Sequence, residues 1–158
     1  MKPTDQTLMK QMHISIEEIE YRRSLLTLTH QELQQLVALG ELLDLEYVID
    51  QVVIRFYQQQ TSISEIAILI GDIDTLSRLQ RAQRQYLVDL FSGNYDANYV
   101  NNRLRIGLVH KRIGVELKLY LSAVYHLKAM LISMIQQQLG DTFDFRQICA
   151  TLEKLFMF

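Results

Sequence analysis

The sequence predicts an all-α protein, and three features support this prediction. The 158 residues include six glycines and one proline, Pro3, so few helix breakers interrupt the chain. No Asn-Gly or Asp-Gly pair and no sustained alternation of polar and apolar residues indicates a β-hairpin. Hydrophobic residues make up 49% of the chain, enough to bury a sizeable core. We expect one domain of about seven or eight helices, packed as a bundle or in a globin-like way.

Two N-terminal capping boxes open the first predicted helices. Ser15 and Thr29 are each followed by a glutamate three residues later. In this arrangement the hydroxyl and the carboxylate each accept a hydrogen bond from a backbone N–H group at the start of a helix. The first box predicts a short helix over residues 15–26. The second opens a helix in which Gly40 is either a mild flaw or the end.

The middle of the chain predicts one further helix and an ambiguous stretch. Asp44 is placed to cap a helix whose apolar residues recur on one face. This helix fades in the polar run at residues 58–62. The following apolar stretch, residues 64–70, is too short to assign a type, and Gly71 then indicates a break.

The second half of the chain predicts four more helices. The first begins at Asp74 and ends at a Ser-Gly-Asn sequence, a common C-terminal signal. The third, at about residues 115–138, is the longest. The fourth, at about residues 143–158, is amphipathic and is followed by no cap or polar tail. We therefore expect the natural chain to continue beyond Phe158. The four segments are about residues 74–92, 96–111, 115–138 and 143–158.

Composition and charge exclude several classes of protein. The formal net charge of −2 argues against nucleic-acid binding through bulk charge. The single cysteine, Cys149, excludes an intramolecular disulfide framework and most thiolate metal sites. No apolar run reaches the roughly 18 residues that span a bilayer, and residues 1–10 lack the apolar core of a signal peptide. We therefore expect a cytoplasmic protein without a membrane span.

Motifs that carry enzyme chemistry are absent. The chain has no Gly-x-Ser-x-Gly, P-loop or Gly-x-Gly-x-x-Gly sequence and no His-x-x-x-His metal motif, so we predict no catalytic residues. Among the four histidines, His110 differs because its neighbours along the chain are apolar. By spacing alone, a lone histidine in such a setting is more often a core residue than a ligand. Arg103 and Arg105 precede it and form either a solvated face or partners for the carboxylates of a ligand.

Residues 103–120 read RLRIGLVHKRIGVELKLY. The pattern Arg-x-x-x-Gly-x-x-His-x-Arg-Ile-Gly-Val, closing on Tyr120, resembles the proximal segment of globin-coupled sensors, the bacterial heme domains of the globin superfamily. Residues 53–57 (VIRFY) resemble the family's distal-tyrosine helix, and residues 78–93 resemble its distal-side helix. The resemblance covers about residues 30–158. It implies a globin fold with an extra N-terminal helix, divided into an extension (1–28) and a sensor domain (29–158).

The resemblance implies a role for individual residues around heme b. His110 matches the proximal histidine that binds the heme iron, and Tyr57 matches the distal tyrosine that donates a hydrogen bond to bound oxygen. Leu79 matches an apolar residue over the ligand site. Ala82 stands where some members carry a polar residue, so that second hydrogen bond is missing here. Tyr120 matches a tyrosine near the proximal histidine in aerotaxis members.

Further residues complete the expected pocket. Arg103 and Arg105 are candidate partners of the heme propionates. Tyr57 could instead be a packing residue, since it follows a phenylalanine. The apolar wall residues would also occur in the core of any helical protein. The expected walls are Phe56, Val109, Ile113 and Val124.

The resemblance also implies how the protein works. Family members signal as dimers, and the helix at 115–138 and the last helix would form an antiparallel four-helix interface between two chains. O₂ would regulate a C-terminal output domain, most often a diguanylate cyclase, otherwise a chemotaxis transducer or a histidine kinase. CO and NO bind the same iron. The domain itself is then not an enzyme. Apolar positions that suit the interface are Leu121, Met130, Ile132 and Met134.

Two alternatives remain open at this point. A cofactor-free helical interaction module would keep His110 and Tyr57 as core residues. A free-standing globin that stores oxygen or reacts with it is the second alternative. The uncapped C-terminus and the long final helices argue against it.

Overall fold

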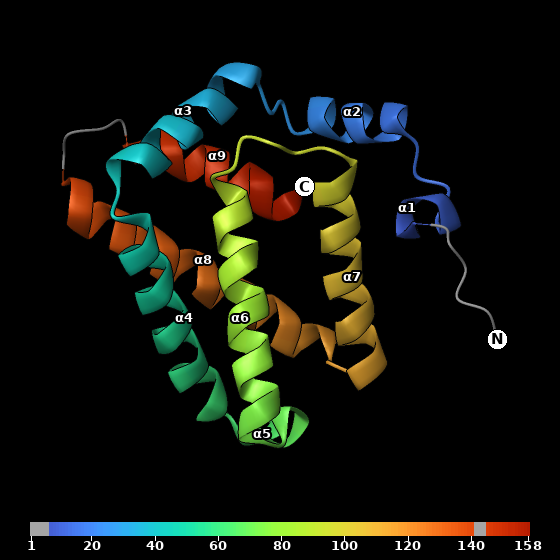
Figure 1. Ribbon diagram of the computed structural model, residues 1–158, viewed down its shortest axis with the longest axis vertical. Helices are drawn as coiled ribbons and strands as arrows, with labels where there is room; N and C mark the ends of the chain where they lie inside the picture. The colour runs from blue at the N-terminus through green and yellow to red at the C-terminus, as the bar shows by residue number, and fades with distance from the viewer. Residues whose placement is uncertain (1–6, 141–144) are drawn as a thin grey trace.

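The computed structural model describes residues 7–140 and 145–158, and all regular structure in that part of the chain is helical (Figure 1). The all-α prediction is therefore confirmed. The predicted start of the last helix, at residue 143, lies outside the described residues. In chain order the helices are α1 (Leu8–Gln11), α2 (Ile16–Leu25), α3 (His30–Leu42), α4 (Leu45–Thr61), α5 (Ser64–Ile70), α6 (Ile73–Leu90), α7 (Ala97–Ile113), α8 (Leu117–Leu139) and α9 (Phe145–Met157).

Side-chain caps begin α2 and α3 as the sequence predicted. Thr29 and Glu32 form a complete capping box. Thr29 Oγ1 accepts a hydrogen bond from the Glu32 N–H at 3.2 Å, and Glu32 Oε2 accepts one from the Thr29 N–H at 2.8 Å. Ser15 Oγ accepts a hydrogen bond from the Glu18 N–H at 3.2 Å, while the Glu18 carboxylate pairs with Arg22 at 2.8 Å. The predicted capping box is therefore complete at α3, whereas at α2 only the Ser15 half of it is formed.

Helix α6 begins earlier than the sequence predicted. Its N-cap is Asp72, whose Oδ1 accepts a hydrogen bond from the Thr75 N–H at 2.6 Å, whereas the prediction placed the start at Asp74. Both aspartates have the chemistry of a cap, so the sequence did not distinguish them. The difference arises at Gly71, which has a φ of 81° and turns the chain directly before Asp72.

Helices α3 and α4 run further than their glycine and glutamine residues suggested. Helix α4 continues to Thr61, because glutamine is compatible with a helix. Gly40 lies inside α3, where a Cβ atom would come within 3.2 Å of the Phe91 Cβ. The glycine therefore permits a close approach between α3 and the end of α6. The unassigned stretch 64–70 is helix α5.

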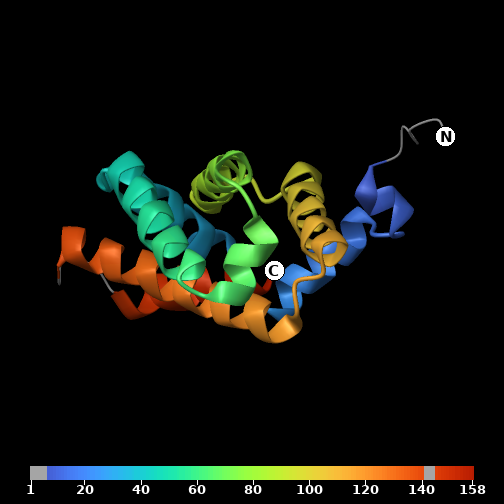
Figure 2. The same ribbon diagram turned by 90° about the horizontal axis from the view of Figure 1, so that it is seen from below.

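Helix α4 lies at the centre of the packing. It packs against both α8 and α6, and α3 packs against α9. Figure 2 shows α8 running beneath α4 and α6. The side chains at these contacts are almost fully removed from solvent and form one core. Its most buried members include Leu36, Leu39, Val48, Ile49, Val52, Leu87, Leu90, Leu131, Ile135 and Leu152.

Helix α7 is held differently from the other long helices. Its closest packing is with the short α1, where the Met9 N–H donates a hydrogen bond to the buried Asn101 side chain at 3.0 Å. Helices α6 and α7 run side by side in Figure 1, yet they are not among the closely packed helix pairs of the described residues. Two apolar side chains near the end of α7 stay exposed, Val109 by 40% and Ile113 by 43%.

The N-terminal segment before α3 contains more structure than the single short helix predicted there. Its described part holds both α1 and α2, and Leu28, at its end, belongs to the hydrophobic core. Among the helices of the described residues, none combines the length and the apolar character that crossing a membrane requires.

Candidate heme site

His110 lies near the C-terminal end of α7 and is half-buried. The helix ends at Gly114, which takes the left-handed conformation with a φ of 73°. The Nδ1 atom of His110 is 2.8 Å from the backbone carbonyl oxygen of Ile106. Because a carbonyl only accepts, Nδ1 donates this hydrogen bond. This tautomer leaves Nε2 as the nitrogen that can bind a metal, which is the arrangement of a metal-binding histidine.

Tyr120 braces the imidazole from the next helix. Its ring meets the His110 ring edge to face, with the centroids 5.2 Å apart and the planes at 77°. Tyr120 belongs to the first turn of α8, directly after the turn that follows Gly114. The ring contact and the hydrogen bond to Ile106 together restrict the rotation of the imidazole.

Tyr57 lies on α4, directly after the buried Phe56. The two rings meet edge to face, with the centroids 5.1 Å apart and the planes at 89°. Burial raises the pKa of the Tyr57 hydroxyl to about 12, so the group is a neutral donor at ordinary pH. In residues 7–140 and 145–158 the hydroxyl makes no hydrogen bond to another side chain, which leaves its proton available to a ligand.

The other predicted wall residues differ in how far the protein covers them. Phe56 is buried, and Leu79 and Val124 are half-buried on α6 and α8. Ala82 is exposed, as are Val109 and Ile113 on α7. Two pairs of these residues are in direct ring contact: His110 with Tyr120, and Phe56 with Tyr57.

Arg103 occupies an environment that the sequence did not indicate. Its guanidinium carbon lies 3.6 Å from the ring centroid of Tyr86 and 4.2 Å from that of Tyr99. Its Nη2 donates a hydrogen bond to the Tyr86 carbonyl oxygen at 3.3 Å. Its Nη1 is buried without a hydrogen-bond partner among the described residues. Arg105, by contrast, is exposed. Tyr86 gave no sequence signal, because it lies on α6 and meets Arg103 only through the fold. Tyr99 is one turn before Arg103 on α7, a spacing that the sequence analysis did not single out.

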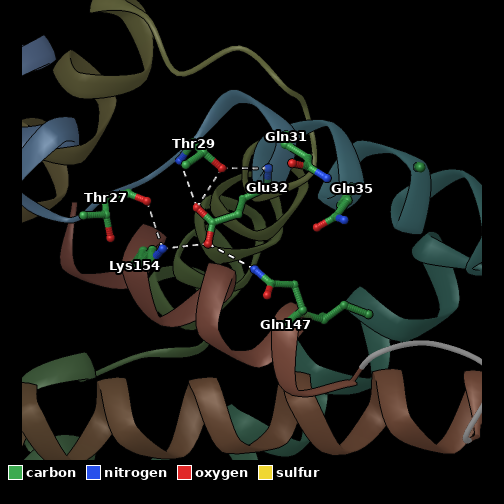
Figure 3. Close-up of a pocket in the computed structure, with 9 residues that line it drawn as sticks. Thr27, Thr29, Gln31, Glu32, Gln35, Gln147 and Lys154 are labelled. Carbon is green, nitrogen blue, oxygen red and sulfur yellow. Dashed lines mark hydrogen bonds and ion pairs between the residues drawn. The ribbon is translucent and has the colours of Figure 1, made fainter.

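A second polar cluster lies between α3 and α9, away from His110. Glu32 is buried and accepts hydrogen bonds from Lys154 Nζ at 2.6 Å and from Gln147 Nε2 at 3.1 Å (Figure 3). Burial by itself raises the pKa of Glu32, but hydrogen bonds from Lys154 and from the Thr29 backbone outweigh it, and the pKa is lowered. These residues line a cavity of about 610 Å³. The Thr29 capping box was the only part of this cluster visible in the sequence.

The residues expected on an association surface of α8 differ in how exposed they are. Leu121 is exposed, and Met130 and Ile132 are half-buried. Met134 is 3% exposed and belongs to the core, so its prediction as an exposed interface residue is wrong. The helix turns this position toward α4, where Arg55 Nη1 reaches the Met134 sulfur at 3.5 Å. Leu117 and Tyr125, which the sequence reading passed over, are exposed on the same helix.

Comparisons with known proteins agree with this arrangement. The globin domain of a Geobacter sulfurreducens globin-coupled sensor superposes with a TM-score of 0.77 and 25% sequence identity, covering 87% of this chain and 90% of that one. The heme-based aerotactic transducer HemAT of Halobacterium salinarum is 33% identical over 75 residues. That match spans 47% of this chain and only 15% of the transducer. The globin fold is confirmed. Since the protoglobin family model matches residues 15–158, the chain belongs to the protoglobin family and resembles the globin domains of globin-coupled sensors.

Proposed function

We propose that this chain is a heme-binding oxygen-sensor domain in which His110 binds the iron. The observation that carries the proposal is the hydrogen bond between His110 Nδ1 and the Ile106 carbonyl at 2.8 Å. It holds the proton on Nδ1 and leaves Nε2 as the nitrogen that can act as a ligand. Such a hydrogen bond also makes the ring a more basic ligand. Family membership supports the same proposal, because the matched residues 15–158 include α7 and His110.

The residues around His110 fit heme b, a largely apolar group with two carboxylates. Ile113 lies three residues after His110, on the same face of α7, and is 43% exposed although it is apolar. A flat apolar cofactor on this face would cover it and Val109, as burial of apolar surface favours. Heme supplies the iron that binds O₂, and CO and NO are its competing ligands.

Tyr57 acts in this proposal as the distal donor. Its hydroxyl stays protonated because burial raises its pKa to about 12, and it has a proton to donate to the O₂ ligand. Leu79, Phe56 and Val124 are the apolar surroundings of that ligand. Ala82 offers no polar group.

The arginines have unequal roles in the proposal. The Nη1 atom of Arg103 is buried and lacks a partner among the described residues, so it suits a heme propionate as acceptor. Arg103 lies seven residues before His110, on the same face of α7 and about 10 Å along the helix. Arg105 is exposed and would contribute at most through solvent-screened attraction.

The proposed signalling unit is a homodimer. Leu117, Leu121 and Tyr125 recur every four residues and form an exposed stripe along α8. An ion pair between Lys128 and Glu153, at 3.2 Å, links α8 to α9 beside this stripe. We propose that two copies pair here in a four-helix contact, and that O₂ binding changes this pairing. The receiver would be a C-terminal output domain in the cytoplasm, in the first place a diguanylate cyclase, otherwise a chemotaxis transducer or a histidine kinase.

An absorption spectrum of the purified, heme-supplied protein tests the proposal. The reduced protein should show a five-coordinate heme band at about 400 nm or somewhat above that shifts under air and again under CO. A six-coordinate reduced spectrum would mean that a second internal ligand competes with the gas. No bound heme at all would contradict the proposal. It would favour the cofactor-free helical interaction module, whose specific support is the exposed stripe on α8.

A further inference from the structure

Gln60 is a polar residue in the core. It is 3% exposed and is the next-to-last residue of α4, and its Nε2 is buried without a hydrogen-bond partner in the part of the chain that the structure describes. Its neighbour Gln58, in the same glutamine triplet, is exposed. The triplet as a whole therefore gives no reason for a buried amide at position 60.

Packing does not explain this amide either. The other inward positions of α4 hold apolar side chains, among them Val52, Val53 and Phe56. An apolar side chain of similar length would fill the same space without burying a polar group. A buried N–H group without an acceptor is destabilising, and such groups in folded proteins nearly always have a partner. Two buried acceptors, Gln59 Oε1 and Gln83 Oε1, also lack a partner in the described residues, so neither of them accepts from Gln60. We therefore expect the acceptor for Gln60 to come from outside the polypeptide.

The position of Gln60 indicates what that acceptor is. Gln60 follows Tyr57 by three residues, so the two Cβ atoms lie about 5–6 Å apart on neighbouring positions of one helix face. It follows Phe56 by four residues, and Phe56 contacts the Tyr57 ring. Thr61 does not compete, because its hydroxyl already donates to the Tyr57 carbonyl at 2.7 Å. In the described part of α4, the Gln60 amide is thus a buried donor without a partner, one turn from Tyr57 on the same helix face.

We propose that Gln60 is a second polar residue of the gas pocket. Its amide donates a hydrogen bond to the O₂ ligand, directly or through one water molecule shared with Tyr57. This inference rests on the proposed heme function. O₂ is a better hydrogen-bond acceptor than CO in such a pocket, so a second donor favours O₂ over CO. Gln60 is in this sense a residue that sets ligand specificity.

The test compares Gln60→Leu with Gln58→Leu in the heme-loaded protein. Gln60→Leu removes the amide and keeps an apolar side chain of similar size, and Gln58→Leu makes the same change at an exposed position of the same triplet. We expect Gln60→Leu to speed O₂ dissociation roughly threefold to tenfold, the effect of one lost hydrogen bond. CO dissociation should change much less, and Gln58→Leu should leave both rates at the wild-type values.

A second measurement uses the heme-free protein. If the amide has no partner within the chain, heme-free Gln60→Leu should melt at a higher temperature than heme-free wild type, because a buried unpaired group has been removed. A lower melting temperature would mean that the amide is paired inside the protein, and would overturn the proposal. Gln60→Met, which also lacks a donor, replaces Gln60→Leu if the leucine variant does not fold.

The outcomes separate this inference from the function on which it rests. If wild type binds heme and O₂ but Gln60→Leu has unchanged O₂ and CO rates, the role of Gln60 is disproved and the heme function stands. If wild type binds no heme, the spectrum of the wild-type protein alone disproves both. If O₂ and CO dissociation accelerate equally, Gln60 fills space and does not discriminate, which also overturns the proposal.

Discussion

The guanidinium of Arg103 lies over the ring of Tyr86, 3.6 Å from its centroid, and so joins α7 to α6. Tyr99 covers the guanidinium as well, and the Tyr99 ring stacks on Phe158 with the centroids 6.1 Å apart. Tyr86 in turn contacts Phe156. The helix of the candidate iron ligand is thereby linked to the last residues of the chain. In residues 7–140 and 145–158, this cluster compensates for the sparse direct packing between α6 and α7.

Replacing Arg103 by alanine should destabilise the fold. The change removes two ring contacts of the guanidinium and the hydrogen bond to the Tyr86 carbonyl, and we expect a loss of about 1–3 kcal/mol in the free energy of unfolding. Denaturant unfolding followed by circular dichroism measures it. Arg105→Ala on the same helix is the matched control and should stay within about 0.5 kcal/mol, because Arg105 is exposed. Equal effects of the two substitutions would contradict the role of the ring cluster.

Replacing His110 by alanine should abolish stable heme retention. The imidazole is the proposed iron ligand, and alanine offers no donor atom. The heme absorbance that remains after gel filtration measures retention. His126→Ala is the control, since His126 is half-buried on α8 and contacts the Tyr125 ring. An unchanged heme spectrum in His110→Ala would exclude this residue as the ligand.

Replacing Tyr57 by phenylalanine should speed O₂ dissociation while heme stays bound. The variant keeps the ring contact with Phe56 and loses one hydrogen bond, worth about 1 kcal/mol or roughly a fivefold change in rate. Flash photolysis or stopped-flow mixing gives the rate. Because the Tyr57 pKa is raised to about 12, its contribution should be constant between about pH 7 and about pH 9. Unchanged oxygen kinetics in the variant would remove Tyr57 from the distal role.

The Glu32–Lys154 pair should make stability depend on acid. The pKa of Glu32 is lowered in the folded protein, so its charged form stabilises the fold above about pH 4.5, and that contribution is lost as the pH falls through the lowered value. Glu32→Gln should cost about 2–3 kcal/mol at neutral pH, because it leaves the partly buried Lys154 without its counter-charge. Urea unfolding at several pH values measures both effects.

The more exposed ion pair between Lys128 and Glu153 provides the control for that experiment. Lys128 Nζ lies 3.2 Å from the Glu153 carboxylate, but solvent screens the pair, so Glu153→Gln should cost less than about 1 kcal/mol. If Glu32→Gln costs no more than Glu153→Gln and loses no pH dependence, the α3–α9 cluster does not stabilise the fold.

Replacing Leu121 by glutamate should shift the protein from dimer to monomer. Leu121 lies in the exposed apolar stripe of α8, and a charge there would be buried against a second copy without a partner. Sedimentation velocity measures the assembly state over a concentration series. Leu25→Glu is the control, because Leu25 is an exposed leucine on α2, away from α8. Dissociation by both variants, or by neither, would contradict an interface at this stripe.

The local signals in the sequence were sufficient for most helix boundaries. The Thr29–Glu32 box, the Asp44 cap and the glycine after α7 act over three or four residues, so chain order alone brings their atoms together. The His110 pattern likewise lies within one helix and the turn after it. This is why the all-α class and the family could be predicted before any tertiary contact was known.

Two features required the structure: which of two equivalent cap residues begins a helix, and which side of a helix is buried. Asp72 and Asp74 are both good caps, and the turn at Gly71 selects the first. Met134 and Leu121 are both apolar residues of one helix, and the packing of α4 on α8 buries only Met134.

The sequence by itself determined the helices, the family and the two residues that we propose on either side of the iron. Only the tertiary structure decided that Arg103 lies between two tyrosines, that Glu32 meets Lys154, and that Gln60 is buried with a free donor. The reason is physical. Caps depend on neighbours within about one turn, whereas the burial of a helix face, a charge or an amide depends on side chains brought from distant parts of the chain.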